Sequence, residues 1–286
     1  MYELLKFVPS PPDGDPLEYV NQFLSGSFYM NSIGYFWKAG FEGQNDLWEG
    51  TARSEKAHDS PLPNDLKSYI KNNVTYRLED CKYINVLSFV RHGYDPISKY
   101  VDAVDPRFAN FGNYVVRIKD LESFVNRVVD AIKKIDNSYG LAGPVVYHHR
   151  NEEIQYQDCF NKWDWFAWQN EWRIAFLPDY PRIRELAYTN PTDLYETPFV
   201  LQVGDVSNLV DVFPTSEYIH GLSKIYNGYS IVEQIDTKEE EIRKIGALGL
   251  PAPYEAFCDQ YVGYNRERFD QLVNGIGLGE RMMFSI

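Results

Sequence analysis

Residues 168–176 form the stretch of this chain that most restricts its fold, because polar and bulky side chains alternate along it. The long polar members are Gln169, Glu171 and Arg173. A period of two is typical of a β-strand, whose successive side chains point to opposite faces. The aromatic residues nearby favour a strand that is half buried. The polar row then faces either solvent, as on an ordinary strand, or a binding site.

The bulk composition is that of a folded, acidic and aromatic-rich protein. The 286 residues carry a net charge of −13, and 16% of them are aromatic. A chain of this length can bury a large core as one domain or two, and aromatic residues favour strands and concave surfaces. The negative charge argues against diffuse attraction to nucleic acid, because phosphate binding relies on clustered Lys and Arg. Nucleic-acid binding would therefore need a local basic patch.

Cysteine usage and the first residues both indicate a reducing compartment. Cys81, Cys159 and Cys258 are far apart and have no paired spacing, so neither a disulfide framework nor a zinc ribbon is expected. The first residues lack the basic and apolar regions of a signal peptide, and no apolar run is long enough to span a bilayer. We therefore expect a cytoplasmic protein without membrane association.

Motifs for metal and nucleotide chemistry are weak. His148 and His149 are adjacent, and on a strand their rings point to opposite faces, so we expect no metal there. Residues 275–279 are glycine-rich, but they follow a predicted helix rather than the strand that precedes a dinucleotide-binding loop. The chain also lacks the sequence signatures of a phosphate-binding loop and of a nucleophile elbow.

Apolar patterning predicts an α+β fold. Strands are expected at residues 4–8, 27–32, 83–90, 113–118, 144–148 and 199–203. Helices are expected at residues 16–23, 65–72, 121–135, 237–246 and 265–274. Beyond Phe213 the β-strand pattern gives way to charged segments with helical patterning. We therefore predict a domain at 1–214 and a small helical C-terminal extension at 215–286 that packs on it.

Five short motifs lie, in chain order, at residues 5–8, 24–32, 44–49, 87–89 and 162–174. Their order resembles a bacterial family known as domain of unknown function 2971. The third is a loop of Phe-Asn-Asp-Pro-Phe-Glu type, and the last a Lys-x-x-x-Trp…Glu-x-Glu-Trp-Arg-Ile stretch. The resemblance covers roughly residues 1–180. Three positions depart from the family pattern, namely Val8 for Arg, Leu47 for Pro and Gln169 for Glu.

The closing motif is similar to the Gln/Glu-x-Glu signature of ADP-ribosyltransferases. This resemblance implies a split, mostly antiparallel β-sandwich with surrounding helices, which binds NAD without a Rossmann loop. It implies that Glu171 bonds the 2′-hydroxyl of the nicotinamide ribose and that Gln169 orients the attacking group, both as catalytic residues. The NAD-binding residues that it implies are Lys6, Tyr29, Asn31, Ser32, Asn45, Asp46 and Arg173.

A single fixed carboxylate suits this chemistry on physical grounds. Breaking the bond between nicotinamide and ribose builds an oxocarbenium-like cation, much as in glycoside hydrolysis. Neutral nicotinamide leaves readily from a pyridinium, so no general acid is needed. The carboxylate acts electrostatically on the developing charge. Gln169 is neutral and a poor general base, which leaves open the identity of the acceptor.

The sequence leaves three functions open. The leading hypothesis is an NAD-dependent ADP-ribosyltransferase that modifies a protein or RNA as a toxin or defence effector. A toxin of this kind would need a neutralising antitoxin protein as a partner. An NAD glycohydrolase, in which water replaces the acceptor, would use the same residues. A non-catalytic module of the same fold would bind a nucleotide or peptide in an aromatic groove without turnover.

Overall fold

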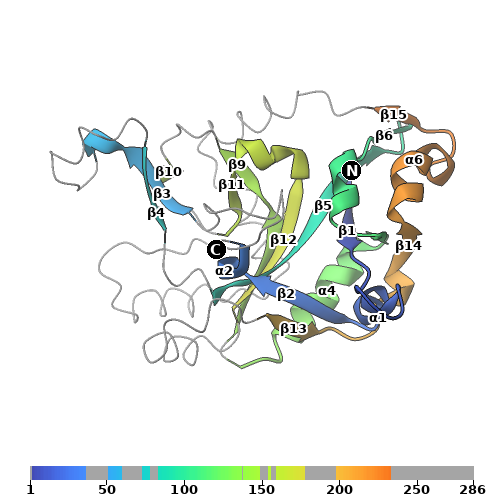
Figure 1. Ribbon diagram of the computed structural model, residues 1–286, viewed down its shortest axis with the longest axis horizontal. Helices are drawn as coiled ribbons and strands as arrows, with labels where there is room; N and C mark the ends of the chain where they lie inside the picture. The colour runs from blue at the N-terminus through green and yellow to red at the C-terminus, as the bar shows by residue number, and fades with distance from the viewer. Residues whose placement is uncertain are drawn as a thin grey trace.

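Figure 1 shows the computed structural model, which describes residues 2–36, 51–59, 73–77, 83–136, 138–148, 154–155, 159–177 and 198–232. A large, mainly antiparallel sheet carries several helices, so the predicted α+β class is confirmed. The main path of this sheet runs through β13 (Phe199–Gln202), β2 (Ser27–Ser32), β5 (Asn85–Asp95), β1 (Tyr2–Val8), β7 (Tyr114–Ile118) and β14 (Val210–Pro214).

The other described strands join this sheet or form two small ones. Those that join it are β12 (Glu171–Leu177), which pairs with β5 and β8 (Tyr139–Pro144), and β6 (Tyr100–Asp102), which pairs with β5 and β15 (Ser230–Val232). The two small sheets are β9 (Val146–His148) with β11 (Asn161–Trp163), and β10 (Ile154–Gln155) with β3 (Thr51–Lys56) and β4 (Asn73–Arg77). The α-helices are α1 (Glu18–Leu24), α2 (Ile33–Phe36), α4 (Leu121–Ile132) and α6 (Thr215–Ile225). The 3₁₀ turns are η1 (Ala57–Asp59), η3 (Pro106–Asn110), η4 (Asp164–Gln169) and η6 (Ser207–Leu209).

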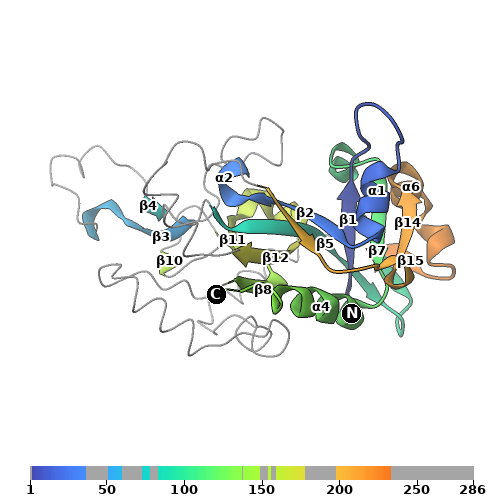
Figure 2. The same cartoon turned by 90° about the horizontal axis from the view of Figure 1, so that it is seen from below.

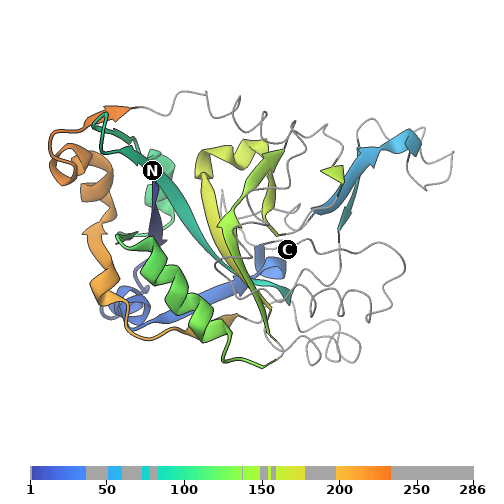
Figure 3. The ribbon, with the colours of Figure 1, turned by 180° about the vertical axis from the view of Figure 1, so that it is seen from behind.

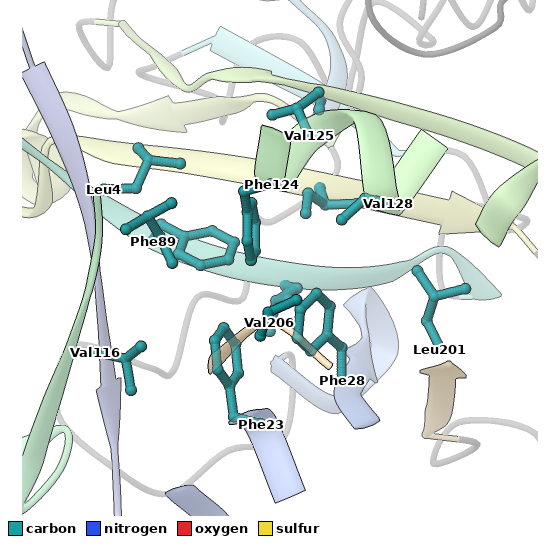
Figure 4. Packing of buried hydrophobic residues seen from close by; sticks show 14 of the residues in the cluster. Leu4, Phe23, Phe28, Phe89, Val116, Phe124, Val125, Val128, Leu201 and Val206 are labelled. Carbon is teal, nitrogen blue, oxygen red and sulfur yellow. The ribbon is translucent and has the colours of Figure 1, made fainter. Parts of the chain in front are cut away.

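The larger core lies between the sheet and α4, which crosses the sheet in the view of Figure 3. Asp120 caps this helix, because its side chain accepts a hydrogen bond from the Ser123 backbone N–H at 3.0 Å. Phe124 of α4 points into the core and stacks on Phe28 of β2, with ring centroids 5.5 Å apart (Figure 4). Phe89 of β5 contacts the Phe124 ring in an edge-to-face arrangement. Aromatic packing therefore joins α4 to the central strands.

A second core lies on the other face of β1 and β7, beneath α6. Its members include Leu5, Phe7, Val115, Tyr218 and Leu222. Successive side chains of a strand point to opposite faces, so β1 contributes to both cores. Helix α6 begins directly after the predicted boundary at residue 214 and packs on the sheet. Most of the predicted extension, residues 233–286, lies outside the described residues.

The sheet divides at β5, where β1 and β2 share one edge of the strand. Val90 pairs with Leu5 of β1 and with Glu171 of β12. Val86 pairs with Asn31 of β2 and again with β12. Because β12 occupies one edge at both positions, β1 and β2 must both lie along the other edge and separate between them. Figure 2 shows β1 standing steeply to β2 and β5.

Most predicted elements in the described part of the chain lie where the patterning places them. β2 coincides with the predicted strand at 27–32, and α4 lies within the predicted helix at 121–135. The patterning did not predict eight of the described strands, namely β3, β4, β6, β8, β10, β11, β14 and β15. β8 contains two glycines and a proline, which patterning takes for a turn. α6 lies in the predicted helical extension, although no helix was placed at its residues. The helices predicted at 65–72, 237–246 and 265–274 lie outside the described residues. Among the helices that are described, none is long and apolar enough to cross a membrane.

Candidate functional site

The strand that carries Glu171 begins later than the alternation suggests. η4 ends at Gln169, and Asn170 adopts a left-handed φ of 40° before β12 starts. Asn tolerates this conformation better than most residues. Arg91 holds it, because its Nη2 donates to Asn170 Oδ1 at 2.8 Å and its backbone N–H to the Asn170 carbonyl at 2.8 Å. The prediction that Gln169 and Glu171 share one strand was therefore wrong, since Gln169 belongs to the 3₁₀ turn.

Four hydrogen-bond donors surround the carboxylate of Glu171. Arg173 provides two of them, with Nε 2.5 Å from Oε1 and Nη2 3.1 Å from Oε2. Lys162 Nζ lies 2.9 Å from Oε2, and the Ser88 side chain also hydrogen-bonds to the carboxylate. An ionised carboxylate has about four lone-pair sites. These donors therefore fill its hydrogen-bonding capacity.

The environment keeps Glu171 ionised. Burial alone would raise the pKa of Glu171, but the charges of Arg173 and Lys162 and the hydrogen bonds from Arg173 and Ser88 outweigh it. The pKa is held well below the usual range. Donors from three strands, β5, β11 and β12, orient the side chain. The site thus presents a negative charge of fixed position.

β9, β11 and η4 cover this side of β12. Val145, Tyr147 and Phe166 pack together as a small apolar cluster beside the carboxylate. The Tyr147 hydroxyl accepts a hydrogen bond from the Glu171 backbone N–H at 2.9 Å. Burial and the charge of Glu171 raise the pKa of Tyr147, so the phenol stays neutral. Because β12 is buried from Glu171 to Phe176, its polar row does not face solvent.

Lys6 meets the same cluster at the position where β1 and β2 separate. Its Nζ donates to the Ser88 carbonyl at 3.1 Å. Burial lowers the pKa of Lys6 to about 8, although the charge of Glu171 acts in the opposite direction. Ser88 therefore connects Lys6, through its carbonyl, with Glu171, through its side chain.

Gln169 lies beside Glu171 through a shared partner. Lys162 Nζ donates to Gln169 Oε1 at 3.0 Å and is at the same time bonded to Glu171. Gln169 is buried, like Glu171. The four predicted residues Gln169, Glu171, Arg173 and Lys6 therefore gather in one place, although not on one strand face.

The predicted residues of β2 lie further along the sheet. Asn31 pairs with Val86, four positions along β5 from the partner of Glu171, which is roughly 13 Å. Tyr29 shares the sheet face of Asn31 and is 56% exposed. Ser32 is buried on the opposite face, where its hydroxyl accepts a hydrogen bond from the Tyr35 N–H. Asn45 and Asp46 lie outside the described residues.

Three residues that contact Glu171 were not singled out from the sequence. Lys162 and Ser88 lie within the matched segments 162–174 and 87–89, but nothing in a single sequence connects them. Tyr147 contacts the backbone of Glu171 rather than a side chain, so no motif marks it. In the described part of the chain, no group of three or more His, Cys, Asp or Glu residues could hold a metal ion.

Comparison of the chain with protein-family models, with curated proteins and with solved structures found no match. Function is therefore inferred from the Glu171 cluster, which consists of Glu171, Arg173, Lys162, Ser88, Gln169 and Lys6.

Proposed function

We propose that this chain is an NAD-dependent ADP-ribosyltransferase that modifies a macromolecular acceptor and uses Glu171 as its fixed carboxylate. The observation that carries the proposal is the position of the Glu171 carboxylate, which Arg173 and Lys162 hold beside the split between β1 and β2. A preorganised charge needs no reorganisation when positive charge develops next to it. The shared edge of β5 is compatible with the split sheet of ADP-ribosyltransferases.

The proposed reaction is a transfer of the ADP-ribosyl group. The bond between ribose C1′ and the nicotinamide nitrogen breaks, and its electron pair neutralises the pyridinium. The acceptor forms a bond to C1′ and releases its proton to solvent. Glu171 would stabilise the positive charge on the ribose and accept a hydrogen bond from its 2′-hydroxyl. Gln169 would orient the acceptor, and the Lys6 ammonium would contact NAD at the split.

A binding module without turnover is the second candidate, and one observation favours it. The donors from Arg173, Lys162 and Ser88 already fill the carboxylate of Glu171. In such a module the ion cluster would only join β5, β11 and β12. Replacement of Glu171 would then change stability or affinity, and no catalytic rate would depend on it.

The test is NAD consumption by purified protein with adenine-labelled NAD and a cell lysate as the source of acceptors. We expect Glu171→Gln to slow NAD consumption by about 10²–10³-fold, because it removes the negative charge and keeps the shape. Glu217→Gln is the matched control, since Glu217 is an exposed residue of α6 and its replacement removes the same charge. Circular dichroism establishes that each variant is folded at the assay temperature.

The outcomes separate the candidate functions. Label fixed to protein or RNA with wild type, and lost in Glu171→Gln alone, supports transfer. Release of nicotinamide without fixed label identifies a glycohydrolase. If folded wild type binds NAD but does not consume it, the binding module is the better description. Equal consumption by wild type and Glu171→Gln would remove Glu171 from the reaction.

A further inference from the structure

The donors of Glu171 differ in how firmly the fold holds them. Arg173 lies two residues along the same strand, and its Nη1 donates to the Cys159 carbonyl. Ser88 is the register partner of Arg173 on β5, so the central sheet fixes its position. Both donors therefore belong to the main sheet.

Lys162 approaches Glu171 from a separate element. It lies on β11, which pairs with β9 in a two-stranded parallel sheet outside the main sheet. Directly after β11 comes η4, whose last residue is Gln169. Lys162 is thus the one donor of Glu171 that a shift of β11 and η4 would withdraw without disturbing the pairing of β12 with β5.

The position of the Lys162 ammonium also matters for the chemistry. Its Nζ stands 2.9 Å from Glu171 Oε2, which is where the proposed reaction needs the hydroxyl and positive charge of a ribose. The same Nζ bonds to Gln169 Oε1 at 3.0 Å. One ammonium therefore occupies the acceptor atoms of both residues of the Gln-x-Glu motif.

We propose that Lys162 occludes the Glu171 carboxylate in the resting protein and must withdraw before NAD can reach it. This inference rests on the proposed function and adds a regulatory contact to the same site. Withdrawal of Lys162 frees a lone-pair site on Glu171 and removes the hydrogen bond from Lys162 to Gln169 Oε1.

The first part of the test compares NAD kinetics of wild type and Lys162→Met. A binding-competent form that is a minor population weakens the apparent affinity by its own fraction. We therefore expect Lys162→Met to lower the KM for NAD by about tenfold or more while kcat changes little. Lys134→Met, at an exposed position beyond α4, removes the same charge and should leave both parameters unchanged.

The second part uses the wild-type protein and does not depend on turnover. The side chain of Lys162 is only 6% exposed, so an amine-reactive reagent should label it slowly. Saturating NAD should speed labelling of Lys162, because NAD displaces the ammonium from Glu171. Mass spectrometry of the labelled peptide measures the rate, and Lys134 in the same sample is the reference.

The outcomes distinguish occlusion from the proposed function. A lower KM in Lys162→Met, or faster labelling of Lys162 with NAD, supports occlusion. If NAD is consumed but KM is unchanged in the folded variant and NAD leaves the labelling rate unchanged or slower, Lys162 is a structural partner and the occlusion proposal is overturned alone. If neither folded protein binds or consumes NAD, the proposed function fails and occlusion fails with it.

Discussion

Glu171 on β12 and Glu3 on β1 are two carboxylates on the same face of the central sheet, but different donors hold them. Cations from Arg173 and Lys162 bind Glu171. Glu3 accepts hydrogen bonds from the hydroxyls of Tyr226 and, at 3.2 Å, Tyr218. The partners of Glu171 are thus mainly cations, whereas the donors to Glu3 are neutral hydroxyls.

The Glu3 cluster also includes an imidazole. His92 Nδ1 lies 3.3 Å from Glu3 Oε1, and His92 Nε2 lies 2.7 Å from the Asp102 carbonyl, which can only accept. These contacts tie β1, β5 and β6 to α6 and the residue that follows it. The Glu3 cluster therefore links chain segments that are far apart in sequence.

The two environments suit the two carboxylates to different roles. Glu171 is ionised and oriented by charge, which suits a group that must act on another charge. Glu3 joins elements through hydrogen bonds that are individually modest in net energy. Loss of a cation at Glu171 leaves a buried carboxylate without a charged partner in the protein interior, where water cannot solvate it. Loss of a hydroxyl at Glu3 leaves another hydroxyl donor in place.

The largest expected effect follows from Arg173→Met, which removes the bidentate partner of Glu171. Breaking a buried ion pair by removing one partner costs about 3–5 kcal/mol, so we expect a loss of that size in the free energy of unfolding. Urea denaturation measures it. Arg107→Met is the matched control, because Arg107 is 56% exposed and pairs with Asp105 at the surface; we expect it to cost about 1 kcal/mol. An equal decrease in the free energy of unfolding of the two variants would show that the buried ion pair of Glu171 stabilises the fold no more than the exposed pair does.

A smaller effect is expected from Tyr226→Phe, which removes one hydroxyl from Glu3 and keeps the ring. Hydrogen bonds to charged groups are worth about 1.5–3 kcal/mol, and the Tyr218 hydroxyl remains as a donor. We therefore expect a loss at the lower end of that range, together with faster amide exchange in α6. Tyr100→Phe, at a position that is 38% exposed, is the control. A loss as large as that of Arg173→Met would contradict the distinction between the two clusters.

A further expected effect is a pH dependence that Lys6 contributes to the Glu171 cluster. The pKa of Lys6 in the folded protein is about 8, against 10.5 for a solvated lysine. Between these pH values the unfolded chain binds more protons than the folded one, so the free energy of unfolding rises with pH. We expect the stability of wild type relative to Lys6→Met to rise by about 2–3 kcal/mol across this interval.

Denaturation of both proteins at several pH values between 7.5 and 10.5 measures this difference. Tyrosine titration is common to the two proteins and cancels in the difference. A constant difference, or one that falls as pH rises, would show that Lys6 keeps the proton affinity of a solvated amine in the fold.

Local patterning was a reliable guide where burial follows a simple period. The strand at β2 and the helix at α4 each bury one face, so alternation and helical spacing predicted them. The alternation along the strand also predicted that Glu171 and Arg173 share one face of β12. The contact of Gln169 with the same site passes through Lys162, which spacing does not reveal. The strand start at Glu171 was not predicted, because the left-handed Asn170 depends on Arg91, 79 positions away.

Amino-acid order alone thus sets the class of fold and marks a short polar motif within an aromatic segment. Packing in three dimensions decided that this motif is buried, that Lys162 and Ser88 complete its donor set, and that Lys6 joins it where β1 and β2 separate. The reason is electrostatic. The charge state and the free lone pairs of a carboxylate depend on every donor within a few ångströms, and here those donors come from strands of two sheets that only the tertiary fold brings together.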